Sequence, residues 1–256
     1  MRTRSRPQRL ARRLLACGGL LLLCGLLGGC GGGASSTSSH ATAAPRHPGT
    51  KTPLTRSRAV AFARAVNLTG ADVPGFTPSS RSEGESAREK QLQSRLHQCV
   101  GQLGFGGPLA DAQSPSFKLR REILDLGVSS EVAVAPTAVQ AARELAAIRG
   151  ARVRECFSHY LDQLLEGRKR GTRLRPVSIA SGTPPAPGAN GSFGWRITAT
   201  FAVGRIPLSL YVDILGFILG PARVTLVSSG VLRPFPAAIQ QRLYALLLAR
   251  ASARAL

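Results

Sequence analysis

The stretch FGWRITATFAVGRIPLSLYVDILGFILGPARVTLVSS, residues 193–229, decides the fold. It contains three runs that alternate apolar and polar residues or are continuously apolar, as β-strands are. The runs lie near 193–203, 206–218 and 222–229. Gly204-Arg205 and Gly220-Pro221 separate them and are typical of tight turns. Three strands joined by such short connections predict an antiparallel meander.

The middle run is expected to be a central strand of this sheet. Its alternate residues place Leu208, Leu210, Val212 and Ile214 on one face, and Tyr211 and Leu215 on the other. Because both faces are apolar, the strand should be covered on both sides. Another strand is expected near 174–181, and two more near 116–125 and 128–135.

Outward from the sheet, apolar residues at the spacing i, i+3, i+4, i+7 predict amphipathic helices. These helices are expected at 58–67, 86–100, 137–149 and 151–166, and from Pro236 onward. Thr137 and Gln140 fit a capping box at the start of the third. Helices, hairpins and a closing helix predict the α+β class: one domain, 58–256, in which an antiparallel β-sheet is packed by helices.

The N-terminus has the features of an export signal. Six arginines and no acidic residue precede Leu14, and residues 14–29 are leucine, glycine, alanine and cysteine alone. These sixteen residues would rise about 24 Å as a helix, less than the roughly 30 Å of hydrocarbon that a permanent span must cross. A cleaved signal is therefore favoured over an anchor helix, and the Arg12-Arg13 pair leaves the Sec and twin-arginine routes both open.

The signal ends in Leu27-Gly28-Gly29-Cys30, which resembles the lipobox of bacterial prolipoproteins. In that family the cysteine thiol receives a diacylglycerol and becomes the first residue of the mature protein. The resemblance implies a signal peptide at 1–29 and a lipid anchor on Cys30 that holds the protein on the outer face of the plasma membrane. An ordinary secretory signal and an uncleaved arm are the alternatives, and they explain fewer of these features. Residues 30–57 are rich in small and polar residues and are expected to form a flexible tether.

Cysteine use favours one disulfide. Once the signal is removed, the domain keeps Cys99 and Cys156, and an oxidising compartment would join them. His97 and His159 lie close to these cysteines in sequence and raise the alternative of a zinc site. In a helix, however, residues two apart point to different faces, so His97 and Cys99 would not converge on one ion. We therefore expect a disulfide and no metal.

The charge of the chain is strongly positive, +21 in total. Removing the six arginines of the signal from the 34 basic residues leaves 28 against 13 acidic residues, or +15. Such a surface should be drawn to anionic lipid or wall polymers. Nucleic acid is not expected as a partner, because export separates the two and aromatic residues for base stacking are only 5% of the chain.

Few residues suggest a site. Asp213 falls inside the most apolar strand, where it would pair with an arginine such as Arg196 or anchor a ligand between sheet and helix. A basic segment after the fourth predicted helix is either a solvated loop or a contact for anionic lipid or polymer. It comprises Arg168, Lys169, Arg170, Arg173 and Arg175. His97 and His159 are expected to face solvent, and no nucleophile elbow or phosphate-binding loop is present, so neither catalysis nor a cofactor is expected.

A second resemblance covers about residues 58–256. The lipobox, the turn at residues 71–76, the helix that carries Cys156 and the meander ending at Ser229 resemble actinobacterial envelope lipoproteins and the extracellular sensor-like domains of some mycobacterial serine/threonine kinases. The order of elements is loosely similar to the PsbP-type fold. The resemblance implies a non-catalytic protein that binds a small apolar or amphipathic ligand or an envelope partner. The alternative is a docking protein that uses a basic face on anionic lipid or wall polymer.

Overall fold

The structure is a computed structural model that describes residues 53–79, 87–101, 107–121, 124–166, 172–174, 177–203, 206–254 and 256. The predicted signal peptide, Cys30 and all but the last residues of the predicted tether lie outside these ranges. Among the described residues, no helix is both long and apolar enough to cross a membrane.

The described strands form one antiparallel sheet in the order β1-β3-β4-β9-β8-β7-β5, with β2 also paired to β4 and β6 to β7. Their bounds are β1 Thr77–Ser79, β2 Ala110–Gln113, β3 Ser116–Arg121, β4 Leu124–Val134, β5 Thr172–Leu174, β6 Ser178–Gly182, β7 Gly191–Val203, β8 Ile206–Leu219 and β9 Ala222–Val231. Strands β7, β8 and β9 are the predicted meander.

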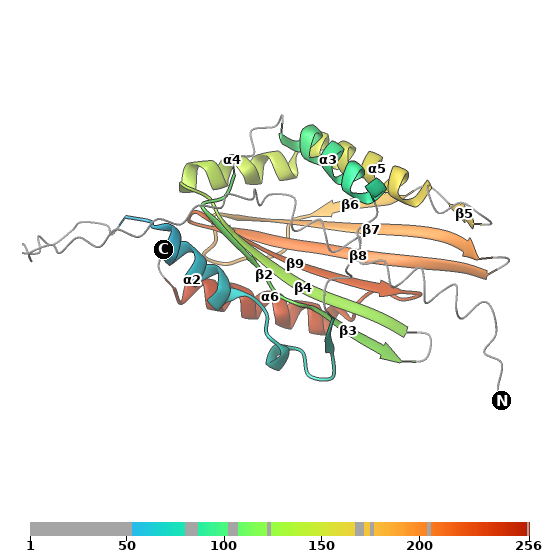
Figure 1. Cartoon of the computed structure of the whole chain (residues 1–256). Coiled ribbons are helices and arrows are strands. Elements are labelled where there is room, and N and C mark those ends of the chain that lie inside the picture. The colour runs from blue at the N-terminus through green and yellow to red at the C-terminus, as the bar shows by residue number, and fades with distance from the viewer. Residues whose placement is uncertain are drawn as a thin grey trace, which may run out of the picture.

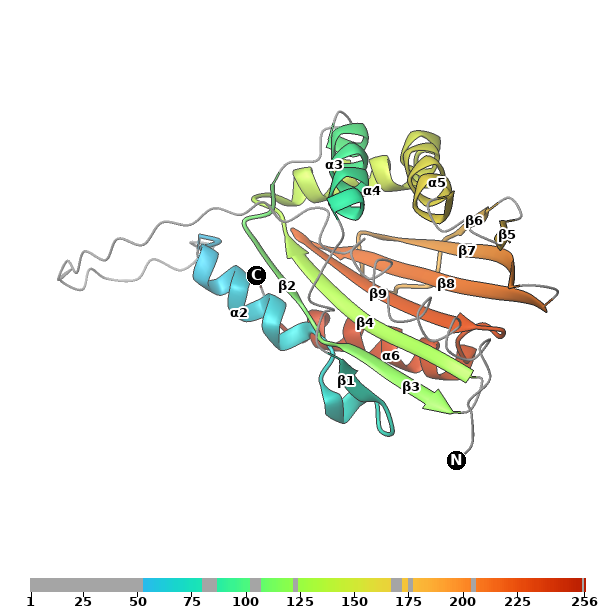
Figure 2. The ribbon, with the colours of Figure 1, turned by 45° about the vertical axis from the view of Figure 1, so that its right-hand side comes forward.

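Helices cover both faces of this sheet (Figure 1). Their bounds are α2 Arg56–Val66, α3 Ala87–Gly101, α4 Ala138–Arg149, α5 Ala151–Glu166 and α6 Ala237–Ser252, with the short 3-10 helix η2 at Gly70–Asp72. Helices α3, α4 and α5 lie on one face, the α3–α5 layer, and α2 and α6 on the other, the α2–α6 layer; Figure 2 shows the same two layers. The predicted α+β fold is confirmed.

Strand β8 is central, as predicted, because it is paired with β7 on one side and β9 on the other. Val212, Ile214 and Ile218 belong to the buried apolar cluster under the α3–α5 layer. Phe217 belongs to the cluster under the α2–α6 layer. The two-sided apolar pattern therefore marks a strand buried between two helical layers.

The edges of the sheet are more broken than the sequence predicts. β2 and β3 pair with successive parts of β4, and β5 and β6 pair with successive parts of β7, where a single strand near 174–181 was expected. β3 ends at Arg121 and β4 begins at Leu124, whereas strands were expected near 116–125 and 128–135. Gly127, between the two expected strands, lies inside β4 opposite Ser229, whose Oγ lies 2.7 Å from where a Cβ would stand.

Threonine hydroxyls cap two helices, one of them, at Thr137, as the sequence predicts. Thr137 Oγ1 accepts from the backbone N–H of Gln140 at 3.1 Å, and Thr55 does the same for Arg58 at 3.3 Å. The Gln140 side chain, however, donates to Glu144 at 3.2 Å. The hydroxyl half of the predicted capping box at Thr137 is thus present, while the Gln140 side chain takes part in a polar site described below.

Gly216 generates a prediction about the core. It lies opposite Phe193 across β7 and β8, and a Cβ on Gly216 would stand 2.2 Å from the ring and 2.9 Å from the Val224 carbonyl oxygen. We expect Gly216→Ala to lower the free energy of unfolding by about 1–3 kcal/mol through overpacking. Urea denaturation measures this free energy of unfolding. Gly182→Ala is the control, because a Cβ on Gly182 would meet nothing within 4 Å. Equal stability of the two variants would contradict this packing.

Candidate functional site

The described residues contain four buried acids, and each lies within ion-pair distance of an arginine. They are Asp72, Glu131, Glu144 and Asp213. A charge removed from water is costly unless it is paired and hydrogen-bonded, so these partners explain how the fold tolerates the acids. The four carboxylates form three separate sites.

The first site is built around Asp213. Asp213, Arg196 and Ser228 are cross-strand neighbours on β8, β7 and β9, so they share the sheet face that α6 covers. Arg196 donates through Nε to Oδ1 at 2.6 Å and through Nη2 to Oδ2 at 3.0 Å. From α6, the Gln240 amide donates to Asp213 Oδ2 at 3.1 Å and to Ser228 Oγ at 2.6 Å. The predicted pairing with Arg196 is confirmed.

Asp213 is buried, but the side chain of its partner Arg196 reaches the surface. The Arg196 side chain is 54% exposed, whereas that of Asp213 is 4% exposed. The hydrogen bonds and the charge of Asp213 raise the pKa of the Arg196 guanidinium above its ordinary value, although burial opposes them. The site therefore joins α6 to the sheet and presents a cation to solvent.

The second site lies on the opposite face of the sheet. Arg223 of β9 donates to Glu144 of α4 at 3.2 Å and lies 3.7 Å from Glu131 of β4. The Gln140 amide also donates to Glu144, and the Gln113 amide to Glu131. Two carboxylates and one guanidinium thus fix α4 on β4 and β9. Glu131, Glu144 and Arg223 each stand inside an apolar strand or helix stripe, as Asp213 does, but among these four only Asp213 is predicted from the sequence as a site residue.

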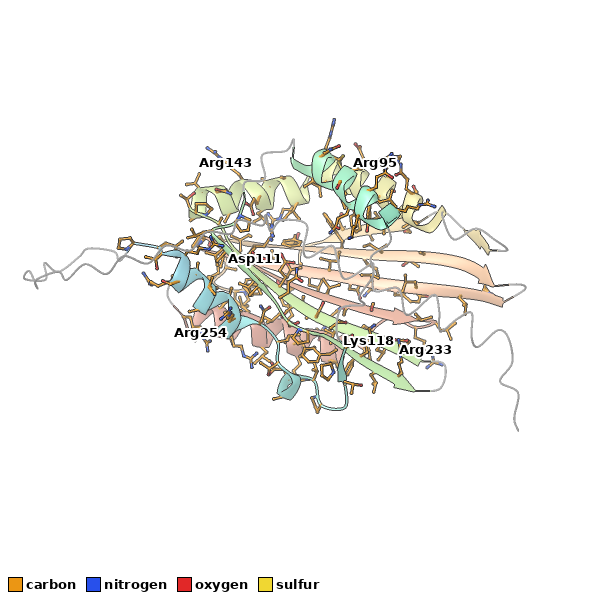
Figure 3. All side chains as sticks on the ribbon, in the orientation of Figure 1. Arg95, Asp111, Lys118, Arg143, Arg233 and Arg254 are labelled. Atoms are coloured by element: carbon orange, nitrogen blue, oxygen red, sulfur yellow. A yellow bond between two sulfur atoms is a disulfide. The ribbon has the colours of Figure 1, made fainter. Side chains whose placement is uncertain are left out.

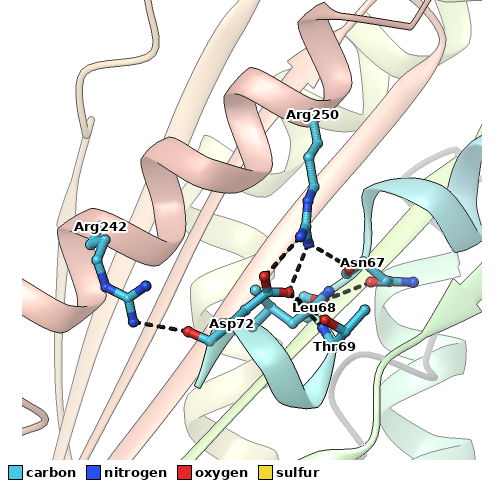
Figure 4. A network of polar contacts seen from close by, with 7 residues as sticks. Asn67, Leu68, Thr69, Asp72, Arg242 and Arg250 are labelled. Carbon is cyan, nitrogen blue, oxygen red and sulfur yellow. Dashed lines mark hydrogen bonds and ion pairs between the residues drawn. The ribbon is translucent and has the colours of Figure 1, made fainter. Parts of the chain in front are cut away.

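The third site is centred on Asp72 of η2 (Figure 4). Arg250 of α6 donates to Oδ1 and Oδ2, both at 2.8 Å, and the backbone N–H and hydroxyl of Thr69 donate to Oδ2 at 2.7 and 3.0 Å. Arg242, also of α6, donates to the Asp72 carbonyl oxygen at 2.9 Å. The motif Thr69-x-x-Asp72 is a capping box, which the sequence displays, but its arginine partners lie about 170 residues away in the chain.

Electrostatics at Asp72 favour the ionised carboxylate. Burial is the largest single effect and raises the pKa of Asp72. The hydrogen bonds from Arg250 and Thr69, together with the charge of Arg250, outweigh burial and leave the pKa below its ordinary value. Asp72 therefore stays charged at neutral pH.

Other predicted site residues fall in different places. Cys99 of α3 and Cys156 of α5 are joined by the predicted disulfide, with their Cα atoms 5.9 Å apart. His159 is exposed, as expected, and its ring hydrogen-bonds to the Gln163 amide at 2.6 Å. Arg168, Lys169, Arg170 and Arg175 lie outside the described residues, as does the His97 side chain; only the backbone of Arg173 is described, in β5. Within the described residues, no group of histidine, cysteine and acidic side chains could hold a metal ion.

The described surface carries many basic side chains. Figure 3 labels Arg95 and Arg143 on the α3–α5 layer and Arg254 beside α2. Exposed basic residues include Arg56, Arg64, Arg88, Lys90, Arg95, Arg143, Arg152, Arg154, Arg233, Arg242 and Arg254. Among the acids with described side chains, the exposed ones are Asp111, Glu155 and Asp162. Among residues with described side chains, exposed basic residues therefore far outnumber exposed acids.

Comparison with known proteins gives a structural likeness of low similarity. No protein-family model and no curated protein matches the chain. Among solved structures, the chain is similar to the extracellular domain of PknH from Mycobacterium tuberculosis, with 12% identity and a TM-score of 0.40. The match covers 79% of this chain and 99% of that chain. A likeness of this degree assigns no function.

Asp72 generates a prediction about acid stability. We expect Asp72→Asn to lower the free energy of unfolding by about 1.5–3 kcal/mol at pH 7, because it removes charge-assisted hydrogen bonds. The pKa of Asp72 in the folded protein lies below its ordinary value of 3.8. The ionised carboxylate therefore contributes its full stabilisation at pH values above 3.8, and this stabilisation is lost as the pH falls through the pKa of the folded protein. Urea denaturation between neutral and acid pH measures the difference.

The matched control for this experiment is Asp111→Asn, since Asp111 is exposed. Its effect on stability should be small at every pH. A gap between wild type and Asp72→Asn that persists undiminished in acid would contradict the assignment of a charged, paired Asp72.

Proposed function

We propose that this chain is a lipid-anchored protein on the outer face of a bacterial plasma membrane, and that its domain binds an anionic component of the envelope without catalysis. One observation carries the proposal. The described buried acids are paired inside the fold, and the described surface is left with a large excess of arginine. The anchor is supported by the lipobox ending at Cys30.

A surface of this kind attracts anionic partners from a distance. Exposed charges act over a Debye length, which is about 8 Å at physiological ionic strength, and a tethered domain stays close to whatever lies on the membrane. Arginine suits phosphate in particular, because its planar guanidinium donates two parallel hydrogen bonds. Headgroups and wall polymers that carry phosphate or carboxylate groups are therefore the partner class that the surface fits.

The chemistry of the buried sites favours binding over catalysis. Asp213 and Asp72 each accept two hydrogen bonds from one guanidinium, and Glu144 accepts from an arginine and a glutamine. A general acid or base must exchange protons with a substrate, and a carboxylate fixed in this way serves instead to join elements of the fold. His159 stands on the exposed side of α5.

A small apolar or amphipathic ligand is the second candidate, and one observation favours it. Ser129 and Thr225 are buried on the sheet face that also carries the Arg223 site, beneath the α3–α5 layer. Hydroxyl groups beside apolar side chains are what an amphipathic ligand would contact. Native mass spectrometry of the membrane-extracted protein would reveal such a ligand as a small molecule released on denaturation.

The proposed function predicts salt-dependent binding to an anionic polymer. The mature lipidated chain, in phosphatidylcholine vesicles, should retain dextran sulfate at low salt and release it at about 0.5 M salt, where screening is strong. Uncharged dextran is the control. Mass spectrometry of the same sample should find a diacylated peptide that begins at Cys30. Equal retention of both polymers, or retention that salt does not change, would contradict the proposed binding, and an unmodified Cys30 would contradict the anchor.

A further inference from the structure

The α2–α6 layer differs in charge from the α3–α5 layer. Neither α2 (RSRAVAFARAV) nor α6 (AAIQQRLYALLLARAS) contains an acidic residue. Exposed arginines on these two helices are Arg56, Arg64 and Arg242, and Arg254 is exposed two residues after the end of α6; we call these four arginines the basic surface. The α3–α5 layer mixes its exposed cations with Glu155 and Asp162 of α5. A purely cationic helical surface is thus found on one face of the sheet.

The basic surface lies where the chain enters the domain. Residues 53–55 lead directly into α2, and the C-terminus lies beside this helix in Figure 1. Leu54 and Leu256 both pack against the apolar cluster under this layer, and Figure 1 places the C-terminus beside the start of α2. Any anchor N-terminal to α2 therefore pulls this end of the molecule toward the membrane.

The predicted tether is short enough for this position to matter. The segment from residue 31 to residue 52 has the composition of a flexible linker, with an expected root-mean-square reach of roughly 25 Å. A domain held on such a linker meets its own bilayer far more often than any distant surface. This step rests on the lipid anchor that belongs to the proposed function.

The outer side of the α2–α6 layer is suited to contact a charged partner and not an apolar one. Among the described residues, Val139 is the large hydrophobic residue that is exposed, and it lies at the start of α4 in the other layer. The basic surface therefore offers guanidinium groups without an apolar wedge. Contacts of this type form with headgroup phosphates at the interface and are weakened by salt, because no side chain inserts into the acyl region.

We infer that the basic surface, Arg56, Arg64, Arg242 and Arg254, rests on the anionic phospholipid headgroups of the bilayer that holds the anchor. In this orientation the α3–α5 layer, with its disulfide, faces away from the membrane. The inference names the partner of the proposed function as lipid and its contact surface as the outer side of α2 and α6.

The test uses the mature lipidated chain with one added cysteine, which is the only free thiol when Cys30 is acylated and Cys99 is bonded to Cys156. A fluorophore is placed at Ala249→Cys on α6 or at Ala146→Cys on α4, both exposed positions. Vesicles of phosphatidylcholine alone, or with phosphatidylglycerol, carry a headgroup quencher. We expect the Ala249 fluorophore to be quenched in the anionic vesicles, with loss of quenching at high salt, and the Ala146 fluorophore to be unaffected.

Charge reversal sharpens the test. The variant with Arg56→Glu, Arg64→Glu and Arg254→Glu should lose the quenching at Ala249. The matched variant with Arg143→Glu, Arg152→Glu and Arg154→Glu, on the other layer, should keep it. All six residues are exposed, so folding should persist, and circular dichroism checks this.

The outcomes separate this inference from the proposed function. Quenching at Ala146, equal quenching at both positions, or quenching that survives reversal of the basic surface would overturn the assigned orientation. An acylated chain that shows no quenching at Ala249 would also overturn it and would leave the anchor standing. A chain without an acyl group at Cys30 would overturn the proposed anchor, and the orientation with it.

Discussion

Burying a carboxylate is costly, and the way in which this protein meets that cost determines how its layers are held together. Asp72, Asp213 and the pair Glu131–Glu144 each have an arginine partner from another element of the fold. Removing one partner of a buried pair typically costs about 3–5 kcal/mol, because the other charge is left unpaired. These contacts therefore specify where α4, α6 and η2 lie on the sheet, while the apolar clusters supply the bulk of the stability.

The surface of the α2–α6 layer differs from the interior in its charge balance. Each buried acid has an arginine partner, whereas α2 and α6 have no acid at all and expose several arginines. A membrane-tethered domain with this surface has a simple means of orienting itself, through attraction to anionic headgroups beside its anchor.

The sequence predicts those features that depend on neighbouring residues. Helix periodicity, the cap at Thr137 and the tight turns of the meander locate α2 to α6 and β7 to β9, and compartment chemistry predicts the Cys99–Cys156 disulfide. Short edge strands such as β1 and β2 carry too few residues to show an alternating pattern. The place of Gly127 inside β4 is hidden for another reason, because only the partner strand reveals that Ser229 occupies the space of its missing side chain. Ion pairs such as Asp72–Arg250 join residues far apart in the chain, so the sequence suggests that a buried charge needs a partner but not which one.

Carboxyl footprinting measures most directly whether the acids are sealed inside the fold. The native full-length mature chain would be treated with a carbodiimide and an amine, digested, and analysed by mass spectrometry, with the urea-unfolded chain as reference. We predict that Asp111, Glu155 and Asp162 are labelled quickly in the native chain, and that Asp72, Glu131, Glu144 and Asp213 are labelled only after unfolding. Native labelling of the second group at the rate of the first would contradict the account, because these acids would then be exposed to solvent and not held in ion pairs inside the fold.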